Sequence, residues 1–512
     1  MQMKQRREKI KRSVLGVIFG IILLLALLAF FAASWYIRVF GVTGFDSILF
    51  TLMGGVGGTG GDLMQSFVVE ALVPSVLLAV VIPTVLFILP KRKLVAYLGK
   101  KFRLCIYPLP KLLSILICLV LSVCLISSGA QSARLPEYLE LMKQKSSLFE
   151  EYYVDPAATT IVFPENKQNL IYIFLESMEV SFVSTELGGG NDINAIPELY
   201  QLAKDHVNFS DNSGVGGFFS HSGSTWTIAA MVSQTSGVPL KVPIGVDGNS
   251  YGKSSSFLPG ITNLTDVLHD AGYYQTLMVG SDANFGGRKQ YYEQHGIDKI
   301  YDLLSARQEG VVPEDYKVWW GMEDAKLFEW AKQELLTISQ QEAPFAFTML
   351  TVDTHHIDGY VCEYCRNDYA EQYENVLACS SRQVANFVTW IQQQDFYENT
   401  TIVICGDHPT MDASYVSSNL TENYQRNLYN CFINAKATPV QEKNRICATI
   451  DMFPTTLAAI GCEIAGNRLG LGTNLFSGEK TLSEQMSLSN FNYELSKPSR
   501  YYERNFYVPK NK

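Results

Sequence analysis

Three long apolar stretches near the amino terminus constrain this chain more than any other feature of its sequence. They cover about residues 14–37, 67–89 and 112–128, and Glu70 is the only acidic residue inside them. A helix needs about 20 apolar residues to cross a bilayer. A buried core helix is the alternative for each stretch, but three of them in the first quarter of the chain predict a membrane domain, residues 1–130, with three spanning helices.

The distribution of charge predicts how these helices are oriented. Residues 1–111 carry 14 Lys/Arg and 4 Asp/Glu, a balance of 14 − 4 = +10, whereas residues 112–512 carry 27 and 46, a balance of 27 − 46 = −19. Cytoplasmic loops retain basic residues, and these cluster before the first stretch and between the second and third. We therefore expect the glycine-rich loop at 54–61, and everything after Ser128, on the outer side of the cytoplasmic membrane. A cleavable signal peptide would leave the large domain on the same side.

The formal net charge of the whole chain is −9. This balance excludes a nucleic-acid-binding protein that works by bulk positive charge.

Beyond the membrane domain, strand-like runs alternate with helix-like runs. This pattern predicts an α/β fold with a central, mostly parallel sheet covered by helices on both faces. The predicted strands and helices are 170–175, 274–279, 345–352, 401–405 and 429–434, and 323–336, 373–394 and 448–460, respectively. The predicted units are a linker at 131–166, a catalytic domain at 167–480 and a tail at 481–512, whose aromatic segment 501–508 we expect to be a strand or a surface strap.

Polar residues follow three of the predicted strands, at the sheet edge where α/β proteins collect reactive groups. A solvated charge is the simple interpretation of any one of them. Together, a glutamate, an aspartate and a histidine at one edge predict a site for one divalent cation. We expect Mn²⁺ there, with Mg²⁺ or Zn²⁺ as alternatives. The residues that follow the strands are Glu176-Ser177, Asp353-Thr354-His355-His356 and Gly406-Asp407-His408.

A hydroxyl-rich segment, HSGSTWT at 221–227, stands directly before a helix-like run, IAAMVSQTSG. The start of a helix favours an anion such as a phosphoryl oxygen. Ser and Thr are also common helix caps for structural reasons alone. A metal ion can turn such a hydroxyl into a nucleophile at neutral pH, so this segment is the candidate source of one.

Several motifs in this order resemble those of a known family. FLES, STWTIAAMVSQTSGVPL, DTHHIDG, CGDHPTMD and ATIDMFPTTLAAIG are similar to segments of the membrane-bound phosphoglycerol transferases of the alkaline phosphatase and sulfatase superfamily. That group includes the lipoteichoic acid synthases and the enzyme that modifies periplasmic glucans, and the likeness is greatest to the glucan-modifying branch. The resemblance covers about residues 169–476.

The resemblance implies a one-metal site and a threonine nucleophile. Glu176, Asp407 and His408 match the family's protein ligands, and a threonine hydroxyl completes the set. Thr227 matches the family's nucleophile at a helix start. Thr225 would match instead if the alignment shifted by two residues.

The resemblance also implies which residues handle the substrate. His355 matches the histidine beyond a central strand, with His356 as its competitor, and Arg288 matches the arginine that holds the glycerol phosphate. The aromatic residue near that arginine in the synthases has no clear counterpart, because Gly286 and Gly287 intervene.

The implied reaction transfers glycerophosphoryl groups from phosphatidylglycerol to a glycan, teichoic acid or glycolipid through a phospho-threonine, and it releases diacylglycerol. A phosphoethanolamine transferase and a sulfatase of the same superfamily are alternatives, as is a non-catalytic membrane receptor for glycerophosphate polymers. A sulfatase needs a C/S-x-P-x-R segment, and the sequence around Thr227 lacks it.

Ten cysteines are present, seven of them beyond the third apolar stretch. Cys362-Glu-Tyr-Cys365 is the spacing of a redox or zinc pair, but no second CxxC follows. An extracytoplasmic location permits disulfides. We therefore expect a local disulfide that involves Cys362, Cys365 or Cys379.

Overall fold

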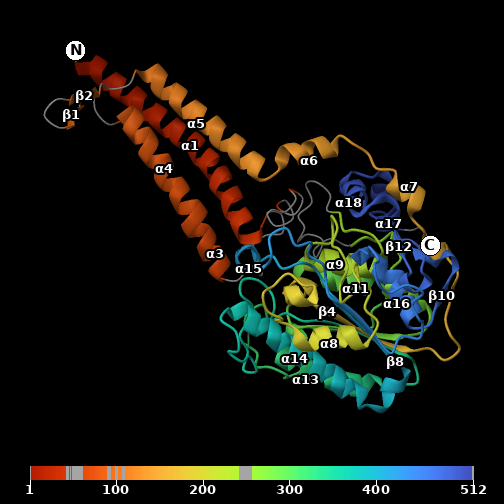
Figure 1. Cartoon of the computed structure of the whole chain (residues 1–512). Coiled ribbons are helices and arrows are strands. Elements are labelled where there is room, and N and C mark those ends of the chain that lie inside the picture. Colours follow the sequence, from red (N-terminus) through yellow and green to blue (C-terminus); the bar gives the residue numbers. More distant parts are fainter. Residues whose placement is uncertain are drawn as a thin grey trace. The chain divides into compact units, whose positions relative to one another are not determined.

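The computed structural model describes residues 2–41, 45, 48, 61–88, 94–98, 102–106, 110–241, 256–316 and 318–509 (Figure 1). The chain forms two compact units. The first consists of Met1–Ile48 and Thr59–Leu139, and the second includes Glu140–Lys512.

The first unit contains three helices that are long and apolar enough to cross a membrane. Their apolar spans are Ile10–Phe40, Met64–Phe87 and Lys111–Ser132, of 31, 24 and 22 residues. The third is longer than the sequence predicted. The second is a continuous helix that contains two π-helical segments, Val68–Leu72 and Thr84–Ile88. The first span lies in α1 (Gln2–Phe40) and the third is α5 (Lys111–Ser132). The second span includes α3 (Gly61–Phe67) and α4 (Val73–Pro83) as parts of one continuous helix.

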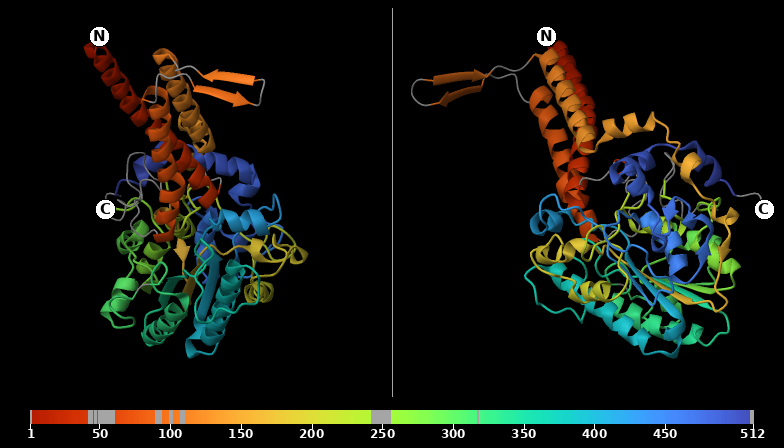
Figure 2. Two further views of the ribbon diagram at one scale, coloured as in Figure 1. Left: turned by 90° about the vertical axis from the view of Figure 1, so that its left-hand side faces the viewer. Right: turned by 45° about the vertical axis from the view of Figure 1, so that its right-hand side comes forward.

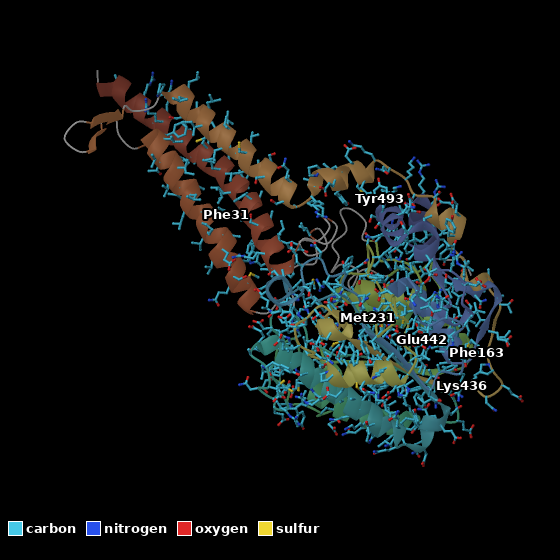
Figure 3. All side chains as sticks on the ribbon, in the orientation of Figure 1. Phe31, Phe163, Met231, Lys436, Glu442 and Tyr493 are labelled. Carbon is cyan, nitrogen blue, oxygen red and sulfur yellow. The ribbon has the colours of Figure 1, made fainter. Side chains whose placement is uncertain are left out.

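Among the described residues of this unit, the helices bury a small apolar cluster, which includes Phe19, Leu23 and Cys118. Many apolar side chains instead point outward from the three helices (Figure 3), and Leu25 is 64% exposed. An apolar surface of this extent is unfavourable in water and favourable in lipid, as expected of a membrane protein with apolar helices near its amino terminus. Glu70, the acidic residue noted above, forms an ion pair with Arg38.

Between the second and third helices the backbone forms an antiparallel hairpin of β1 (Leu94–Leu98) and β2 (Phe102–Ile106). Of the basic residues in this loop, Arg103 belongs to β2, whereas those at 91–93 and 100–101 lie outside the described residues. The predicted glycine-rich loop at 54–61 also lies outside them, except for Gly61 at the start of α3.

The second unit is built on a six-stranded sheet with the order β6-β5-β7-β4-β8-β9. All neighbours are parallel except β8 and β9. This arrangement confirms the predicted α/β class and the mostly parallel sheet. The strands are β4 (Asn169–Leu175), β5 (Tyr274–Val279), β6 (Lys299–Tyr301), β7 (Phe345–Leu350), β8 (Thr400–Gly406) and β9 (Asn430–Ile433).

Helices cover both faces of this sheet (Figure 2), so its central strands β4, β7 and β8 are buried along almost their whole length and consist largely of apolar residues. In β4, Tyr172 and Phe174 belong to one core cluster, and Ile171 and Ile173 belong to the other. The first face is covered by α9 (Thr227–Ser236), α10 (Leu264–Asp270), α11 (Arg288–Gln294) and α16 (Met452–Ala459), and the second by α8 (Pro197–Asp205), α13 (Asp324–Ile338) and α14 (Gln372–Gln392).

Shorter elements complete the unit. They are β3 (Ile161–Val162), β10 (Glu463–Ile464), β11 (Arg468–Leu469), β12 (Gly472–Thr473), α6 (Leu135–Met142, which begins in the first unit), α7 (Leu148–Tyr152), α12 (Leu303–Gln308), α15 (Ala413–Asn419), α17 (Leu482–Met486), α18 (Leu488–Ser496) and α19 (Arg500–Asn505).

The carboxyl-terminal segment corrects one prediction. The aromatic residues at 501–508 were expected in a strand or a surface strap, but most of them belong to α19 and the turn after it. Tyr502 and Phe506 are four residues apart, so they share one side of a helical turn, and both are buried. Their rings pack against Phe149 of α7 at centroid distances of 5.5 and 5.7 Å.

Candidate functional site

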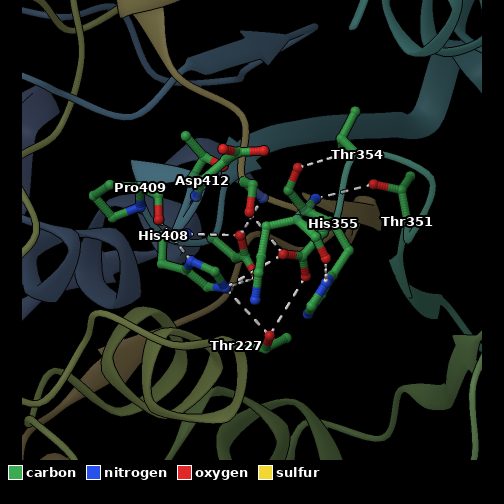
Figure 4. A network of polar contacts seen from close by, with 12 residues as sticks. Thr227, Thr351, Thr354, His355, His408, Pro409 and Asp412 are labelled. Carbon is green, nitrogen blue, oxygen red and sulfur yellow. Dashed lines mark hydrogen bonds and ion pairs between the residues drawn. The ribbon is translucent and has the colours of Figure 1, made fainter. Parts of the chain in front are cut away.

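The candidate site lies beyond the carboxyl ends of β4 and β8, where four polar side chains from three distant segments meet (Figure 4). Glu176 directly follows β4, Asp407 and His408 follow β8, and Thr227 is the first residue of α9. Thr227 Oγ1 lies 3.4 Å from Glu176 Oε2 and 3.3 Å from His408 Nε2. His408 Nε2 lies 3.4 Å from both Glu176 Oε1 and Asp407 Oδ2.

Strand pairing explains why Glu176 and Asp407 meet. β4 and β8 are parallel neighbours, and Leu175 pairs with Gly406 at their carboxyl ends. The residues that follow therefore leave the sheet side by side. The Ser177 N–H donates to Asp407 Oδ1 at 2.8 Å, although the two residues are 230 positions apart. Ser177 has a φ of 52°, so the chain turns sharply after Glu176.

The donor atoms fit a divalent cation. Asp407 Oδ1 accepts hydrogen bonds from the N–H groups of Ser177 and His408, whereas its buried Oδ2 accepts none within the described part of the chain. His408 Nδ1 lies 3.0 Å from the Pro409 carbonyl oxygen and must donate to it, which leaves the Nε2 lone pair facing the group. One donor atom each from Glu176, Asp407 and His408 lie within 4.8 Å of one another.

Charge in this group is unbalanced in a way that a cation would relieve. Burial opposes ionisation of Glu176, but His408 and His355 together hold the pKa of this carboxyl below its ordinary value. Burial and then the charge of Glu176 raise the pKa of Asp407. Burial lowers the pKa of His408, but Asp407 and Glu176 outweigh it and raise the pKa. Two carboxylates that compete for positive charge are the environment in which a divalent ion binds.

The structure distinguishes the two candidate threonines by position. Thr227 begins α9, where the first N–H groups of a helix lack partners within it, and its hydroxyl reaches Glu176 and His408. Thr225 makes no hydrogen bond to Glu176, Asp407 or His408 within the described residues. The assignment of the nucleophile to Thr227 stays a prediction that this geometry favours.

The end of β7 lies against the end of β4. The Glu176 N–H donates to Thr351 Oγ1 at 3.0 Å, and the Thr354 hydroxyl donates to the Glu176 carbonyl oxygen at 2.5 Å (Figure 4). These bonds place His355 close enough to Glu176 to influence its charge. The His355 Nδ1–H donates to the carbonyl oxygen of His356 at 2.7 Å. The Nε2 atom of His355 is therefore the one that carries a lone pair.

Both histidines beyond β7 are neutral at neutral pH. Burial, partly opposed by Glu176, lowers the pKa of His355. Burial and the neighbouring imidazoles lower the pKa of His356 much further. His356 is buried, whereas His355 is partly exposed. His355 is thus the better placed of the two to exchange a proton with a substrate.

Arg288 lies beyond the end of β5 at the start of α11. Its Nη2 donates to Ser281 Oγ at 2.9 Å and to the Asp282 carbonyl oxygen at 2.8 Å, while its buried Nε has no partner in the described part of the chain. Burial lowers its pKa, and Glu176 and Asp282 oppose this shift. The residue stays charged, so an anion would find a fixed cation with a free N–H.

Two aromatic residues lie near Arg288, where the sequence showed no clear counterpart of the aromatic residue found in the synthases. Phe285 stands directly before the two glycines, and its ring centroid lies 5.8 Å from Arg288 Cζ. The Trp320 ring lies 6.0 Å from Phe285 and 4.4 Å from His355. Sequence reasoning missed Trp320, because this residue stands in a turn where no periodicity marks it.

A second pair of acids, Asp324 and Asp353, lies beyond β7. Asp324 accepts from the N–H groups of Val352 and Asp353 at 2.7 and 3.1 Å, and its own N–H donates to Asp353 Oδ1 at 3.1 Å. Burial raises the pKa of both carboxyls, with a contribution from Asp324 at Asp353. At least one carboxyl of this pair is therefore protonated at neutral pH.

His221, which precedes the hydroxyl-rich segment's serines, does not join the site. It is buried, its Nε2 lies 2.8 Å from Ser233 Oγ of α9, and its Nδ1 lies 2.9 Å from the Ser222 carbonyl oxygen. These contacts fix the loop against α9.

The sheet and the donor group define an α/β domain with a candidate divalent-metal site at one sheet edge. A family profile named Sulfatase matches residues 168–462, and the chain belongs to this family within the sulfatase and alkaline phosphatase superfamily, which is metal-dependent. The resemblance inferred from the motifs is thereby confirmed.

The chain is also similar to curated proteins. It is 32% identical over 356 residues to "Phosphoglycerol transferase I" of Xanthomonas campestris pv. campestris, covering 66% of this chain and 48% of that protein. It is 32% identical over 345 residues to the Salmonella choleraesuis protein of the same name, covering 66% and 42%. The chain thus spans about half the length, or less, of the curated relatives it matches.

Among solved structures, an alkaline phosphatase superfamily protein from Vibrio parahaemolyticus is 20% identical, with a TM-score of 0.48 and coverage of 67% of this chain and 77% of that one. The lipoteichoic acid synthase LtaP from Listeria monocytogenes is 17% identical, with a TM-score of 0.48 and coverage of 62% and 79%.

Proposed function

We propose that this protein transfers glycerophosphoryl groups from phosphatidylglycerol to a hydroxyl acceptor of the cell envelope, a glycan, teichoic acid or glycolipid. The observation that carries the proposal is the position of the Thr227 hydroxyl, 3.3 Å from His408 and 3.4 Å from Glu176 at the start of α9. The relatives named phosphoglycerol transferase support the choice of reaction.

Glu176, Thr227, Asp407 and His408 would hold one divalent ion, with Mn²⁺ as the first choice and Mg²⁺ or Zn²⁺ as alternatives. When bound, such an ion lowers the pKa of a coordinated hydroxyl and neutralises charge on phosphoryl oxygens. The free Oδ2 of Asp407 and the lone pair on Nε2 of His408 are the atoms best placed to hold the ion.

The side chains divide the two-step reaction between them. In the first step, Thr227 Oγ1 forms a bond to phosphorus and the bond from phosphorus to the diacylglycerol oxygen breaks. The threonine proton passes to His355, which returns it to the leaving alkoxide. In the second step an acceptor hydroxyl gives its proton to His355 and attacks phosphorus, and Thr227 recovers the proton as it leaves.

Arg288 and the start of α9 would hold the equatorial phosphoryl oxygens, where charge concentrates during transfer. The guanidinium is fixed by Ser281 and Asp282, so it needs little reorganisation when the phosphate binds. Phe285 and Trp320 provide an apolar wall beside it, against which a glycerol backbone can pack. His356 is the alternative binding residue at the end of β7.

The proposed location is the cytoplasmic membrane, crossed several times, with the catalytic domain on the extracytoplasmic side. The three apolar helices and the cluster of basic residues at the amino terminus support this orientation. A membrane-bound enzyme meets a phospholipid donor in the same bilayer and need not capture it from solution.

The test uses full-length protein in detergent with headgroup-labelled phosphatidylglycerol and Mn²⁺. Diacylglycerol release and a glycerophosphoryl adduct on Thr227, found by peptide mass spectrometry, are expected. Thr227→Ala should abolish both, Thr227→Ser should restore part of the activity, and Thr225→Ala is the matched control that retains it. Loss of the adduct in Thr225→Ala alone would move the nucleophile by two residues.

The same assay separates the alternatives. Turnover of phosphatidylethanolamine but not phosphatidylglycerol would indicate a phosphoethanolamine transferase, and turnover of an aryl sulfate would indicate a sulfatase. Binding of a glycerophosphate polymer without turnover of any of these substrates would indicate a receptor. Each of these results would overturn the proposal.

A further inference from the structure

Three cysteines outside the proposed active site converge on one point. Cys362 Sγ lies 3.7 Å from Cys365 Sγ and 3.6 Å from Cys379 Sγ, and all three sulfurs lie within 4.8 Å of one another. Cys362 and Cys379 are buried, and Cys365 is partly exposed. No other cysteines contact each other among the described residues.

The sulfur positions do not match the disulfide expected from the sequence. All three cysteines are free thiols, and the sulfurs stand far beyond the bond length of about 2.05 Å. One disulfide would also leave the third cysteine without a partner. In a tetrahedral zinc site with Zn–S bonds of about 2.3 Å, ligand sulfurs stand about 3.8 Å apart. The two measured separations are close to that edge length.

The geometry points to a second metal site, in which Cys362, Cys365 and Cys379 bind one Zn²⁺ as thiolates. Binding forms three Zn–S bonds, releases three thiol protons to solvent, and leaves a fourth position for a water molecule. Solvent can reach this position on the side of the partly exposed Cys365. Soft thiolate ligands favour Zn²⁺ over the hard cations that suit carboxylate groups.

The surroundings support three bound thiolates. The Cys365 N–H donates to the Cys362 carbonyl oxygen at 3.1 Å, and this tight turn directs both sulfurs toward α14. The Gln383 amide lies one helical turn after Cys379, and its Nε2 donates toward Cys379 Sγ at 3.5 Å and Cys362 Sγ at 3.8 Å. Such N–H donors offset the negative charge that three thiolates retain around one Zn²⁺.

The site would fix the loop that carries His355. This loop leaves β7 and runs to Cys365 before α14 begins. It already contacts α14, because the Tyr373 hydroxyl donates to the Thr354 carbonyl oxygen at 2.8 Å. Gly359, with φ of 65°, packs so closely that an added Cβ would lie 2.7 Å from Val376. Zinc would hold the far end of the loop to the same helix, which makes the three cysteines positioning residues for His355.

The first experiment measures metal in full-length protein purified in detergent without chelator, reductant or added metal. Inductively coupled plasma mass spectrometry should find about one zinc per chain. Cys379→Ser should lose it, whereas Cys462→Ser, which removes a buried cysteine with no cysteine neighbour, should keep it. The double variant Glu176→Gln/Asp407→Asn should also keep it, which separates this site from the acidic group whatever reaction the latter performs.

A second measurement covers the case in which Cys379→Ser does not fold. Titration of the native wild-type protein with an organomercurial should release one zinc, read with a chromogenic chelator, as three thiols react. Replacement by Co²⁺ should give a thiolate-to-metal charge-transfer band in the near ultraviolet. Stoichiometric copper in place of zinc, release of no metal, or a disulfide among these cysteines in non-reduced peptide maps would overturn the inference.

Discussion

The ends of β4 and β8 differ from the ends of β5 and β7 in the chemistry they present. Beyond β4 and β8 stand carboxylate oxygens, an imidazole nitrogen and a hydroxyl, all suited to a cation and a nucleophile. Beyond β5 and β7 stand a buried guanidinium, a neutral imidazole and two aromatic rings, all suited to an anion with an organic group attached. One sheet edge thus separates the groups that would bind the cation and attack phosphorus from the groups that would hold the substrate, and His355 beyond β7 would also exchange the proton.

Two pairs of acidic residues at this edge, Glu176 with Asp407 and Asp324 with Asp353, also differ in their surroundings. Asp324 receives one backbone N–H group on each oxygen, and Asp353 Oδ1 receives the N–H of Asp324, so Asp353 Oδ2 is the oxygen of this pair that has no partner among the described residues. Asp407 also receives two backbone N–H groups, but on one oxygen only, and its second oxygen faces Glu176 and His408. The two acid pairs therefore differ in what faces the free oxygen, because at Asp407 the second carboxylate and an imidazole nitrogen both lie beside it.

The largest effect is expected at the reacting half of the comparison. Asp407→Asn removes one negative charge from the donor group and should lower both Mn²⁺ binding and diacylglycerol release by about 10³-fold or more. Titration of Mn²⁺ followed by electron paramagnetic resonance measures the first, and the lipid assay measures the second. The control is Asp395→Asn, an exposed aspartate. Retention of a tenth of the activity would show that Asp407 is no ligand.

A smaller effect is expected at the substrate-holding half. Arg288→Lys keeps the charge but loses the fork that Ser281 and Asp282 fix. Loss of a charge-assisted hydrogen bond costs about 1.5–3 kcal/mol, so kcat/KM for phosphatidylglycerol should fall about 10- to 100-fold. Lys289→Ala, whose exposed side chain pairs with Glu293, is the neighbouring control. Equal Mn²⁺ affinity in wild type and Arg288→Lys is required, because the comparison assigns Arg288 to the substrate.

Much of the second unit could be predicted from the sequence because its central strands are buried on both faces. A strand covered on both faces reads as one apolar run, so β4, β7 and β8 and the polar residues after them were visible. β6 was missed because it has only three residues, two of which are only partly buried. β9 was placed correctly, but its antiparallel direction depends on pairing that the sequence does not state.

The adjacency of the site residues could not be read in the same way. β4 lies between β7 and β8 in the sheet, although these strands come late in the chain, and only the register brings Glu176 beside Asp407. Trp320 lies in a turn and Phe285 in a single 3₁₀ turn, and neither segment is long enough to show a periodicity. The spacing of the cysteines was visible in the sequence, but the chemistry that they support was not. That chemistry depends on the turn at Cys362 and on the face of α14 that carries Cys379.

The aromatic wall offers a finer test of the comparison. Trp320→Ala should raise KM about three- to tenfold, since a lost aromatic contact is worth about 0.5–1.5 kcal/mol. A modest fall in kcat should accompany it, because the ring also supports His355 at 4.4 Å. Trp320→Phe should restore most of both. Unchanged kinetics in Trp320→Ala would remove the aromatic wall from the substrate-holding half.

The smallest effect concerns the Asp324–Asp353 pair and is an effect on stability. Burial raises the pKa of Asp353 above its ordinary value of 3.8, so the folded protein holds a proton there that the unfolded chain has lost. The stabilisation from that proton is complete below about pH 4 and declines as the pH rises toward the folded pKa, by about 1.4 kcal/mol per pH unit for one proton. Asn does not titrate, so Asp353→Asn should remove this part of the decline.

Thermal unfolding of the detergent-purified protein between pH 5.5 and 8.5 measures the difference. The melting temperature of Asp353→Asn relative to wild type should rise steadily with pH, while that of Asp395→Asn should stay constant. Parallel curves for Asp353→Asn and wild type would mean that Asp353 is ionised in the folded protein. The carboxylate beyond β7 would then carry a full negative charge for a cation to bind, and the contrast between the two acid pairs would fail.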